Sequence, residues 1–542
     1  MKNGNLYLKQ NVLVEPLFNQ WYAWPHLISP ATAAMYVTNM HLKILQSFAA
    51  APQIHVAALK NPAMRGGPFI NYDADKSPGI KALIEQTNKV QAPLLELASA
   101  IQRINATLAS DASGFSLEPL YDKVPEPLKG YVELVYDLNN HPSVRFIEGL
   151  LYKSPYYTED PQSIALSLVD RDERPFALST PHLGDSGKLY LHLPFRSAAL
   201  DELFKMKTEP RPLDYIKEAL KVAEADEELF SSFFTDEAPP PPPVHDDDSV
   251  RVRYFGHACI LIESSETSIL FDPLISYKYE NGVQRYTYAD LPEVIDYVVI
   301  THSHQDHCMF ETLLQLRHKV RNILVPRNNG GGLADPSLKL ILQNVGFKNV
   351  VEVDEMETVE VEGGGITGLP FLGEHADLNI RTKLAYLTNL KGQKVICAAD
   401  SNNVEPSLYR HLHSAVGDVD ALFLGMECEG GPLSWLYGPL LPSPLARKMD
   451  QSRRLDGSDH AKGMDIVNRL NAKRVYIYAM GQEPWLTFLT SIQYTPQSRP
   501  IVESDKVVAE CHGRGITSER LFGQKEIFLR PHHGGLQLGA AV

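Results

Sequence analysis

Residues 301–307, THSHQDH, constrain this chain more than any other feature of its sequence. They place His302, His304, Asp306 and His307 within six residues. One histidine in a polar loop needs no special explanation. Imidazoles and a carboxylate at this density are typical of a metal site, because both groups donate lone pairs to metal ions. The cluster therefore predicts a metal-binding loop.

The flanking sequence sets the geometry of this loop. Residues 294–300 form a short apolar run with β-branched side chains, which predicts a buried strand, and residues 310–316 predict a short helix. Alternate residues of a strand share a face, so the end of the strand can aim His302 and His304 in one direction. The turn that follows brings Asp306 and His307 to a second metal-binding point. Two metal ions about 3.5–4 Å apart need such a divided set of ligands.

The clearest boundary along the 542 residues is the segment FTDEAPPPPPVHDDDSV. Its prolines (239–243) form a stiff polyproline stretch and its aspartates (246–248) repel one another, so neither run joins a packed core. We therefore predict a docking or dimerisation domain over residues 1–238, a linker over 239–248 and a di-metal catalytic domain over 249–542.

The N-terminal region shows no catalytic motif. Apolar spacing predicts a long helix or a helical pair over residues 80–108, bent near Pro93, and a further helix over residues 213–234. Residues 187–195 predict a strand, so a mixed α+β domain is expected. The aromatic cluster in residues 18–26 fits either a ligand platform or buried packing.

Composition argues against several classes of function. The formal net charge is −15, from 51 basic and 66 acidic side chains, and such a surface repels nucleic acid and anionic membranes. The sequence has no run of eighteen apolar residues to span a bilayer, and its first residues lack the apolar core of a secretory signal. The five cysteines form no CxxC pair, as in reduced cytoplasmic proteins. We expect a cytoplasmic protein with no nucleic-acid or membrane partner.

Two motifs resemble the metallo-β-lactamase fold. THSHQDH is similar to its HxHxDH signature, and residues 254–273, YFGHACILIESSETSILFDP, resemble its opening hairpin. The resemblance implies an α/β protein with a C-terminal αββα sandwich and a dinuclear metal site at one edge, between the two sheets. The apolar segment VICAADS, residues 395–401, leads to Asp400, which resembles the aspartate that bridges both metals in this family.

Two positions depart from the common hydrolase pattern. Where hydrolases carry a third histidine, this chain reads LPFLGEHADLNI, with Glu374 beside His375, and spacing alone does not decide which of them binds metal. Near the end of the domain, Ala479 and Met480 stand where a further histidine is usual, and His460 is the nearest substitute.

With Glu374 as a ligand, the site becomes rich in carboxylates. One metal is then expected to bind His302, His304, Glu374 and Asp400, and the other Asp306, His307, Asp400 and His460. Such sites, with open positions, suit iron better than zinc. The change from histidine to glutamate therefore favours redox chemistry over hydrolysis.

The whole arrangement resembles the di-iron β-hydroxylases of chloramphenicol biosynthesis and nonribosomal peptide assembly. The shared features are an N-terminal region that opens near VEPLFNQWYAWPHLISPATAA, the HSHQDH motif, a GEH that supplies Glu374, and Asp400 in AADS. The resemblance implies a monooxygenase with two iron ions that uses O2 and a protein electron donor. Its implied substrate is an amino acid, tethered as a thioester to a carrier domain of a nonribosomal peptide synthetase and hydroxylated at the β-carbon. A homodimer is also implied.

Further residues are candidates for roles beside the metals. His257, in the opening hairpin, and Glu427, after another strand, are candidates to support catalysis with Glu374 and Asp400, and ordinary packing or surface placement is the alternative for each. The basic residues at 447–454 form either a solvated helical face or a docking patch for an acidic carrier domain. The competing functions are a dinuclear zinc hydrolase, acting on a thioester, lactone or phosphodiester, and a non-enzymatic scaffold with a vestigial metal site.

Overall fold

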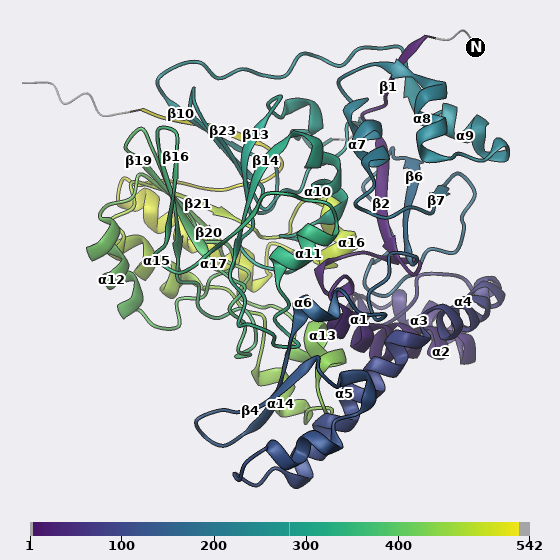
Figure 1. Cartoon of the computed structure of the whole chain (residues 1–542). Coiled ribbons are helices and arrows are strands. Elements are labelled where there is room, and N and C mark those ends of the chain that lie inside the picture. Colours follow the sequence, from purple (N-terminus) through teal and green to yellow (C-terminus); the bar gives the residue numbers. More distant parts are fainter. Residues whose placement is uncertain (1–3, 281, 531–542) are drawn as a thin grey trace, which may run out of the picture.

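The computed structural model describes residues 4–280 and 282–530 (Figure 1). The ends of the two predicted domains, residues 1–3 and 531–542, lie outside the described residues. The C-terminal part contains two mixed sheets of seven strands each. In spatial order, the first sheet consists of β15 (Val350–Val353), β14 (Val320–Pro326), β13 (Ile295–Val299), β12 (Ser268–Phe271), β11 (Ile260–Glu263), β10 (Val250–Tyr254) and β23 (Lys525–Leu529). The second consists of β16 (Thr358–Val361), β17 (Gly364–Leu369), β18 (Ala385–Leu390), β19 (Gln393–Cys397), β20 (Ala421–Gly425), β21 (Arg474–Tyr478) and β22 (Thr517–Arg520).

The strands bury both faces because their apolar side chains alternate between two cores. On β20, Ala421 and Phe423 belong to the core between the sheets, whereas Leu422 and Leu424 face the outer helices. The outer face of the first sheet packs on α10 (Phe310–Leu316) and α11 (Leu338–Asn344). The second sheet is covered by α12 (Ser407–Val416), α15 (His460–Arg469) and α17 (Arg499–Gly513). The predicted αββα sandwich is confirmed.

The N-terminal part is the predicted mixture of helices and strands. Its largest sheet has the order β3-β2-β6-β7, beside the small sheet β8-β1-β9 and the hairpin β4-β5. The strands are β1 (Asn5–Leu8), β2 (Val12–Phe18), β3 (Trp21–Tyr22), β4 (Val132–Tyr136), β5 (Pro142–Phe146), β6 (Gln162–Leu168), β7 (Leu189–Leu191), β8 (Arg211–Pro212) and β9 (Phe234–Thr235). The helices include α1 (Pro30–Tyr36), α2 (Leu42–Ala50), α3 (Pro52–Leu59), α4 (Ser77–Val90), α5 (Ala92–Asp111), α6 (Glu148–Leu151), α7 (Ala198–Lys205), α8 (Leu213–Leu220) and α9 (Glu227–Ser231).

Two of the N-terminal helix predictions had different outcomes. The helical pair is confirmed, because α4 and α5 meet at Gln91, two residues before the proline that was expected to bend it. The single helix over residues 213–234 is wrong. Lys221 adopts a left-handed conformation (φ 55°) that ends α8, and the chain restarts as α9.

The two parts of the chain are joined by more than the proline-rich segment, which runs between β9 and β10 across the top of Figure 1. One continuous apolar core contains side chains from both parts, including Phe195 and Phe310, whose ring centroids are 6.5 Å apart. Beside it, Arg174 of the N-terminal part contacts Glu311 of α10 at 2.7 Å. The aromatic cluster of residues 18–26 is part of this core, so buried packing describes it. Among the helices of the described residues, none is both long and apolar enough to cross a membrane.

Candidate metal centre

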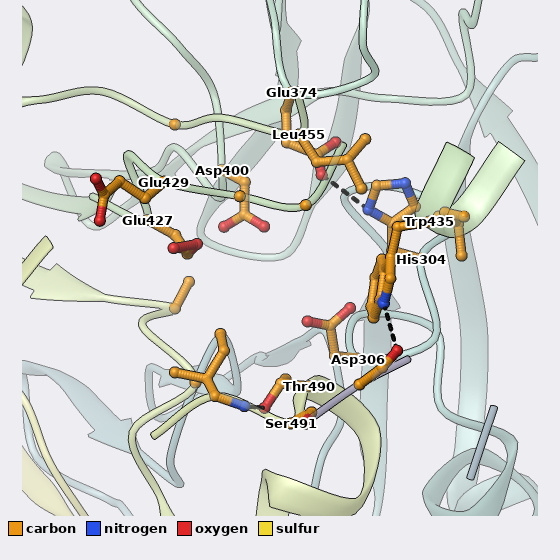
Figure 2. Close-up of a pocket in the computed structure, with 18 of the residues that line it drawn as sticks. His304, Asp306, Glu374, Asp400, Glu427, Glu429, Trp435, Leu455, Thr490 and Ser491 are labelled. Carbon is orange, nitrogen blue, oxygen red and sulfur yellow. Dashed lines mark hydrogen bonds and ion pairs between the residues drawn. The ribbon is translucent and has the colours of Figure 1, made fainter. Parts of the chain in front are cut away.

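All the predicted ligands except His460 lie where strands of both sheets end, and four of them, His304, Asp306, Glu374 and Asp400, line one cavity of about 300 Å³. The histidine-rich loop follows β13, Glu374 follows β17 and Asp400 follows β19. Figure 2 shows both carboxylates, with His304 and Asp306, around this space. Residues that are far apart in sequence meet here because loops at the ends of rigid strands can converge on one cleft.

One candidate group contains His302, His307 and Asp400, whose ligand atoms lie within 4.8 Å of one another. His307 Nε2 lies 3.2 Å from Asp400 Oδ2. On the other side of the ring, His307 Nδ1 lies 2.8 Å from Asp272 Oδ2, so it donates its proton there and leaves a lone pair on Nε2. Asp272 itself accepts from the backbone N–H and the hydroxyl of Thr301. Metal-binding histidines usually have such a carboxylate behind them.

A second group contains His302, His304 and Glu374. His304 Nδ1 lies 2.9 Å from Glu374 Oε1, and His304 Nε2 lies 2.8 Å from the Tyr437 hydroxyl. The other carboxylate oxygen of Glu374 lies 2.6 Å from His375 Nδ1. Of the two alternatives that the sequence left open, Glu374 joins the candidate ligands, and His375 contacts that carboxylate.

The third group contains His257, Asp306 and His307. His257 lies in the turn between β10 and β11, and its Nε2 is 3.3 Å from Asp306 Oδ2. The Gly481 N–H donates to His257 Nδ1 at 3.1 Å. A neutral imidazole that accepts at Nδ1 carries its proton on Nε2, and that proton faces Asp306. We therefore expect His257 to orient Asp306 instead of binding a metal.

The structure does not bring His460 to these ligands. His460 begins α15, and its Nε2 lies 2.7 Å from Glu510 Oε2 on α17. None of the three candidate groups among the described residues contains it. Ala479 and Met480 line the cavity at the position of the usual histidine. The expectation that His460 completes the second metal set fails because α15 and α17 pair it within the outer helical layer.

Several buried polar atoms of the site lack a hydrogen bond among the described residues, although His307 Nε2 lies 3.2 Å from Asp400 Oδ2. Within the part of the chain that the structure describes, His302 Nε2, His307 Nε2 and Asp400 Oδ1 make no hydrogen bond. An unpaired buried polar atom costs about 1–3 kcal/mol, so such atoms are rare unless something else satisfies them. Their convergence from several strand ends fits the coordination of two metal ions, with Asp400 between them.

At His302 and Glu374 the electrostatics favour the protonation states that bind metal. Burial lowers the pKa of His302 well below its ordinary value, and the neighbouring His307 lowers it further. Burial raises the pKa of Glu374, but His304 and His375 more than reverse this and bring it to about 2. A neutral imidazole and a charged carboxylate are the forms that donate lone pairs to a metal. At His304 and His307 burial lowers the pKa, but the neighbouring carboxylates more than reverse this and raise it above its ordinary value, so a bound metal would take the place of those protons.

The backbone around the site is held in an unusual conformation. The dihedral φ is positive at His257 (50°), Asp272 (37°), Glu374 (62°) and Ala399 (47°). A left-handed conformation costs an L-residue roughly 1–2 kcal/mol, and it tends to persist at functional sites. Three of these residues contribute side chains to the cluster, and Ala399 immediately precedes Asp400.

Glu427 lies beside the metal ligands, as expected, and lines the same cavity (Figure 2). Burial and the neighbouring Asp400 raise the pKa of Glu427 to about 8. Three other groups were not predicted as functional: Asp272, Tyr437 and Trp435. Asp272 belongs to the FDP segment of the opening hairpin, but nothing in the local pattern pointed to the other two.

Matches to known families divide the chain at the same place as its architecture. Residues 251–424 match the β-lactamase superfamily domain. This domain and its clustered ligands define a metal-dependent enzyme of that superfamily. Residues 7–239 match the N-terminal domain of the diiron non-heme β-hydroxylases.

Similar proteins cover nearly the whole chain. It is 39% identical over 521 residues to the 4-amino-L-phenylalanyl-[CmlP-peptidyl-carrier-protein] 3-hydroxylase of Streptomyces venezuelae, covering 95% of this chain and 98% of the relative. The crystal structure of CmlA, a diiron β-hydroxylase from Streptomyces venezuelae, matches with a TM-score of 0.91 and 38% identity, over 97% of this chain and 100% of that one. A UPF0173 protein of Pyrococcus abyssi is 25% identical over 175 residues, or 32% of this chain and 69% of the relative. The chain belongs to the diiron non-heme β-hydroxylase family and is an enzyme of this class.

Proposed function

We propose that this enzyme hydroxylates the β-carbon of an amino acid that is held as a thioester on the carrier domain of a nonribosomal peptide synthetase. Its S. venezuelae relative is named for an aminoacyl group on a peptidyl carrier protein, and that relative aligns with 95% of this chain. The observation that carries the proposal is Glu374 in the shared ligand space, where the hydrolase pattern has histidine. It gives the site three carboxylates, with Asp306 and Asp400, and such a set favours iron.

The proposed ligand set is His302, His304, Asp306, His307, Glu374 and Asp400. In this set Asp400 is central, because one of its oxygens lies 3.2 Å from His307 Nε2 and the other has no hydrogen bond among the described residues. Bound iron would supply the electron transfer and O2 activation that no side chain of the site can perform.

The surrounding residues hold the ligands in place. Asp272 keeps the His307 proton on Nδ1, and the Tyr437 hydroxyl contacts the His304 nitrogen that faces away from Glu374. His257 holds Asp306, and His375 contacts Glu374. Partners of this kind fix ring orientation and ligand basicity. The cavity beside the ligands is where the amino acid would be aligned, which removes much of the entropic barrier to reaction.

The proposed role of the N-terminal part is to position the substrate. Its residues Arg65 and Gly66 line the metal cavity, so this part of the chain reaches the reaction centre directly. Of the basic residues at 447–454, Arg453 and Arg454 donate to the backbone oxygens of Ala376 and Gly430. They hold neighbouring loops, which leaves Arg447 and Lys448 to serve as a carrier dock. A protein electron donor, a homodimer and a cytoplasmic location stay predictions.

Mass spectrometry of a loaded carrier after turnover under ¹⁸O2 tests the proposal. We expect two irons per chain and one labelled oxygen on the tethered amino acid. Release of the amino acid from the carrier, together with two zincs per chain, would instead establish the hydrolase alternative. No O2 consumption by the reduced, iron-loaded protein with any carrier would favour the scaffold alternative.

A further inference from the structure

A second cavity lies directly beside the metal cavity. Its volume is about 530 Å³, larger than the 300 Å³ beside the ligands, and Gly66, Pro432 and Trp435 line both. Bound small molecules usually occupy cavities of roughly 300–1,000 Å³, so each of these spaces is large enough for part of a ligand. The two are neighbours across one shared wall.

That wall is thin and comes from both parts of the chain. The Trp435 indole N–H, from α13 (Leu433–Tyr437), donates to the Gly66 backbone oxygen at 2.9 Å, and Figure 2 shows Trp435 at the margin of the metal cavity. Gly66 has a positive φ of 73°, and a Cβ there would meet Ser491 Cβ at 3.2 Å. Only a residue without a side chain lets the N-terminal loop approach this closely without strain.

The second cavity combines an apolar lining with a cation. Ile44, Met40, Phe69 and Phe176 contribute apolar surface. Lys43, on α2, is exposed and lines the same cavity. Over residues 4–280 and 282–530, no carboxylate forms an ion pair with Lys43. In a chain of net charge −15, an unpaired lysine on a cavity is a local attraction for an anion.

We propose that the second cavity binds the phosphopantetheine chain by which a carrier domain presents its amino acid. Lys43 binds the phosphate, the apolar lining packs the methylene and gem-dimethyl groups, and the thioester passes the wall of Trp435 and Gly66. The aminoacyl group then lies in the metal cavity. The choice of occupant follows from the position of the two cavities on either side of one shared wall and from charge, and it rests on the proposed function.

This arrangement explains why a wall separates two spaces of different character. The metal cavity is lined by His304, Asp306, Glu374, Asp400 and Glu427, and suits the reacting amino acid. A long, flexible chain gains little from such a polar site, but burying it in an apolar groove restricts its motion and fixes where the thioester lies. Aligning the tethered amino acid in this way is what makes the reaction effectively unimolecular.

Calorimetric titration of the full-length, metal-loaded enzyme with 4′-phosphopantetheine and with unphosphorylated pantetheine tests the proposal. We expect Lys43→Glu to weaken phosphopantetheine binding roughly tenfold, because an attraction becomes a repulsion, and to leave pantetheine binding unchanged. The matched control is Lys81→Glu, an exposed lysine on α4 that lines neither cavity, and it should change neither affinity. High salt should reduce the effect of Lys43→Glu.

A second variant tests the cavity independently of charge. Met40→Trp places a bulky ring into the space and should weaken both ligands by at least about tenfold, since a filled cavity cannot hold them. Turnover of an aminoacyl thioester of N-acetylcysteamine, which lacks most of the chain, should persist in this variant. Loss of that turnover would show that the cavity holds the amino-acid side chain, and would overturn the proposal.

The outcomes separate this inference from the proposed function. Wild-type affinity for both ligands in Lys43→Glu and Met40→Trp, or no binding of either ligand to the wild type, would overturn the cavity assignment. If phosphopantetheine binds through Lys43 but no loaded carrier is hydroxylated, the cavity assignment stands and the proposed reaction fails.

Discussion

Two regions of this molecule bury charged side chains, and they do so in opposite ways. Where the N-terminal part meets the first sheet, Arg174 contacts Glu15 at 2.8 Å and Glu311 at 2.7 Å. At the metal centre, His302 Nε2 and Asp400 Oδ1 have no hydrogen-bond partner in the described part of the chain. The charges of the first region are paired within the protein, although Arg174 Nε makes no hydrogen bond among the described residues. The unpaired atoms of the second region converge from several strand ends and fit a bound metal.

Electrostatics sharpen this contrast. Burial raises the pKa of Glu15, but His182 and Arg174 lower it by more, so Glu15 stays charged as part of a closed network. At the metal centre, burial and neighbouring rings lower the pKa of His302, which keeps it neutral and leaves a lone pair unused. The network near Arg174 should therefore govern stability, and the metal centre should govern activity.

Asp400→Asn should give the largest effect. The variant keeps the shape of the side chain but removes the charge between the two candidate groups, so we expect it to lose metal and at least about 100-fold in activity. Metal analysis and O2 consumption measure this. Thermal unfolding of the metal-free variant and the metal-free wild type measures the part of the effect that comes from folding, because Asp400 lies 3.2 Å from His307 Nε2 without metal. Full metal content with normal activity would show that Asp400 is not the shared ligand.

Arg174→Ala should give the largest loss of stability. Removing this guanidinium leaves Glu311 without an ion pair among the described residues, although Glu15 keeps Lys188 at 2.7 Å, and breaking a buried pair in this way costs about 3–5 kcal/mol. Denaturant unfolding of the metal-loaded protein measures it. Arg171→Ala is the matched control, since Arg171 pairs with Asp170 in solvent with 70% of its side chain exposed. That control should stay within about 0.5 kcal/mol of the wild type. Equal losses of stability in Arg174→Ala and Arg171→Ala would show that the buried Arg174 network contributes no more to folding than an exposed ion pair.

Asp272→Asn should have an intermediate effect, on metal affinity. The asparagine no longer holds the His307 proton as a carboxylate does, so we expect metal to bind about 10–100-fold more weakly. Competition with a chelator measures this affinity. Asp335→Asn is a control of similar burial. Among the described residues, the Asp335 carboxylate accepts hydrogen bonds from backbone N–H groups alone, those of Asn329, Arg381 and Thr382. The Asp335→Asn variant should lose stability but keep its metal affinity. Weaker metal binding in both variants would mean that Asp272 acts only through folding.

The candidate ligands that could be predicted from the sequence come from local motifs. The His302–His307 loop, Glu374 and Asp400 each follow an apolar strand, and the structure places all of them at strand ends around one cavity. Such positions can be predicted because strand periodicity and a short motif lie in the same few residues. The same reasoning expected His257 near the metals, and it lies 3.3 Å from Asp306.

The other features of the site and the fold depended on contacts between segments that are far apart in the sequence. Tyr437 reaches His304 from the end of α13, 133 residues later, and no local pattern marks it. His460 is the converse case: its place in the motif order suggested a ligand, but α15 and α17 pair it with Glu510. The continuous core between the two parts was also hidden, because a proline-rich segment indicates a boundary in sequence but not how tightly the flanking parts pack.

The smallest expected effect is a pH dependence at a second contact between the two parts of the chain. Glu148, at the start of α6, accepts from Asn328 Nδ2 at 2.8 Å and from the Ser337 N–H at 2.9 Å, both in the C-terminal part. Burial raises its pKa to about 7, and the hydrogen bonds from Ser337 and Asn328 only partly oppose this. Unlike Glu15, Glu148 forms no ion pair with a cation among residues 4–280 and 282–530.

The sign of the effect follows from that raised pKa. Folded protein binds the Glu148 proton more tightly than unfolded protein does, so the stabilisation is full below the ordinary pKa of 4.5 and is lost as the pH rises to about 7. Because the side chain is partly exposed, we expect a loss of only about 1–2 kcal/mol over that range. Denaturant unfolding between pH 4.5 and 8 measures it. Glu148→Gln should flatten this part of the profile, whereas Glu118→Gln, at an exposed site, should keep it. If the free energy of unfolding of Glu148→Gln kept the same dependence on pH, the Glu148 carboxyl would have to be charged at this contact. The contact would then resemble the Arg174 network.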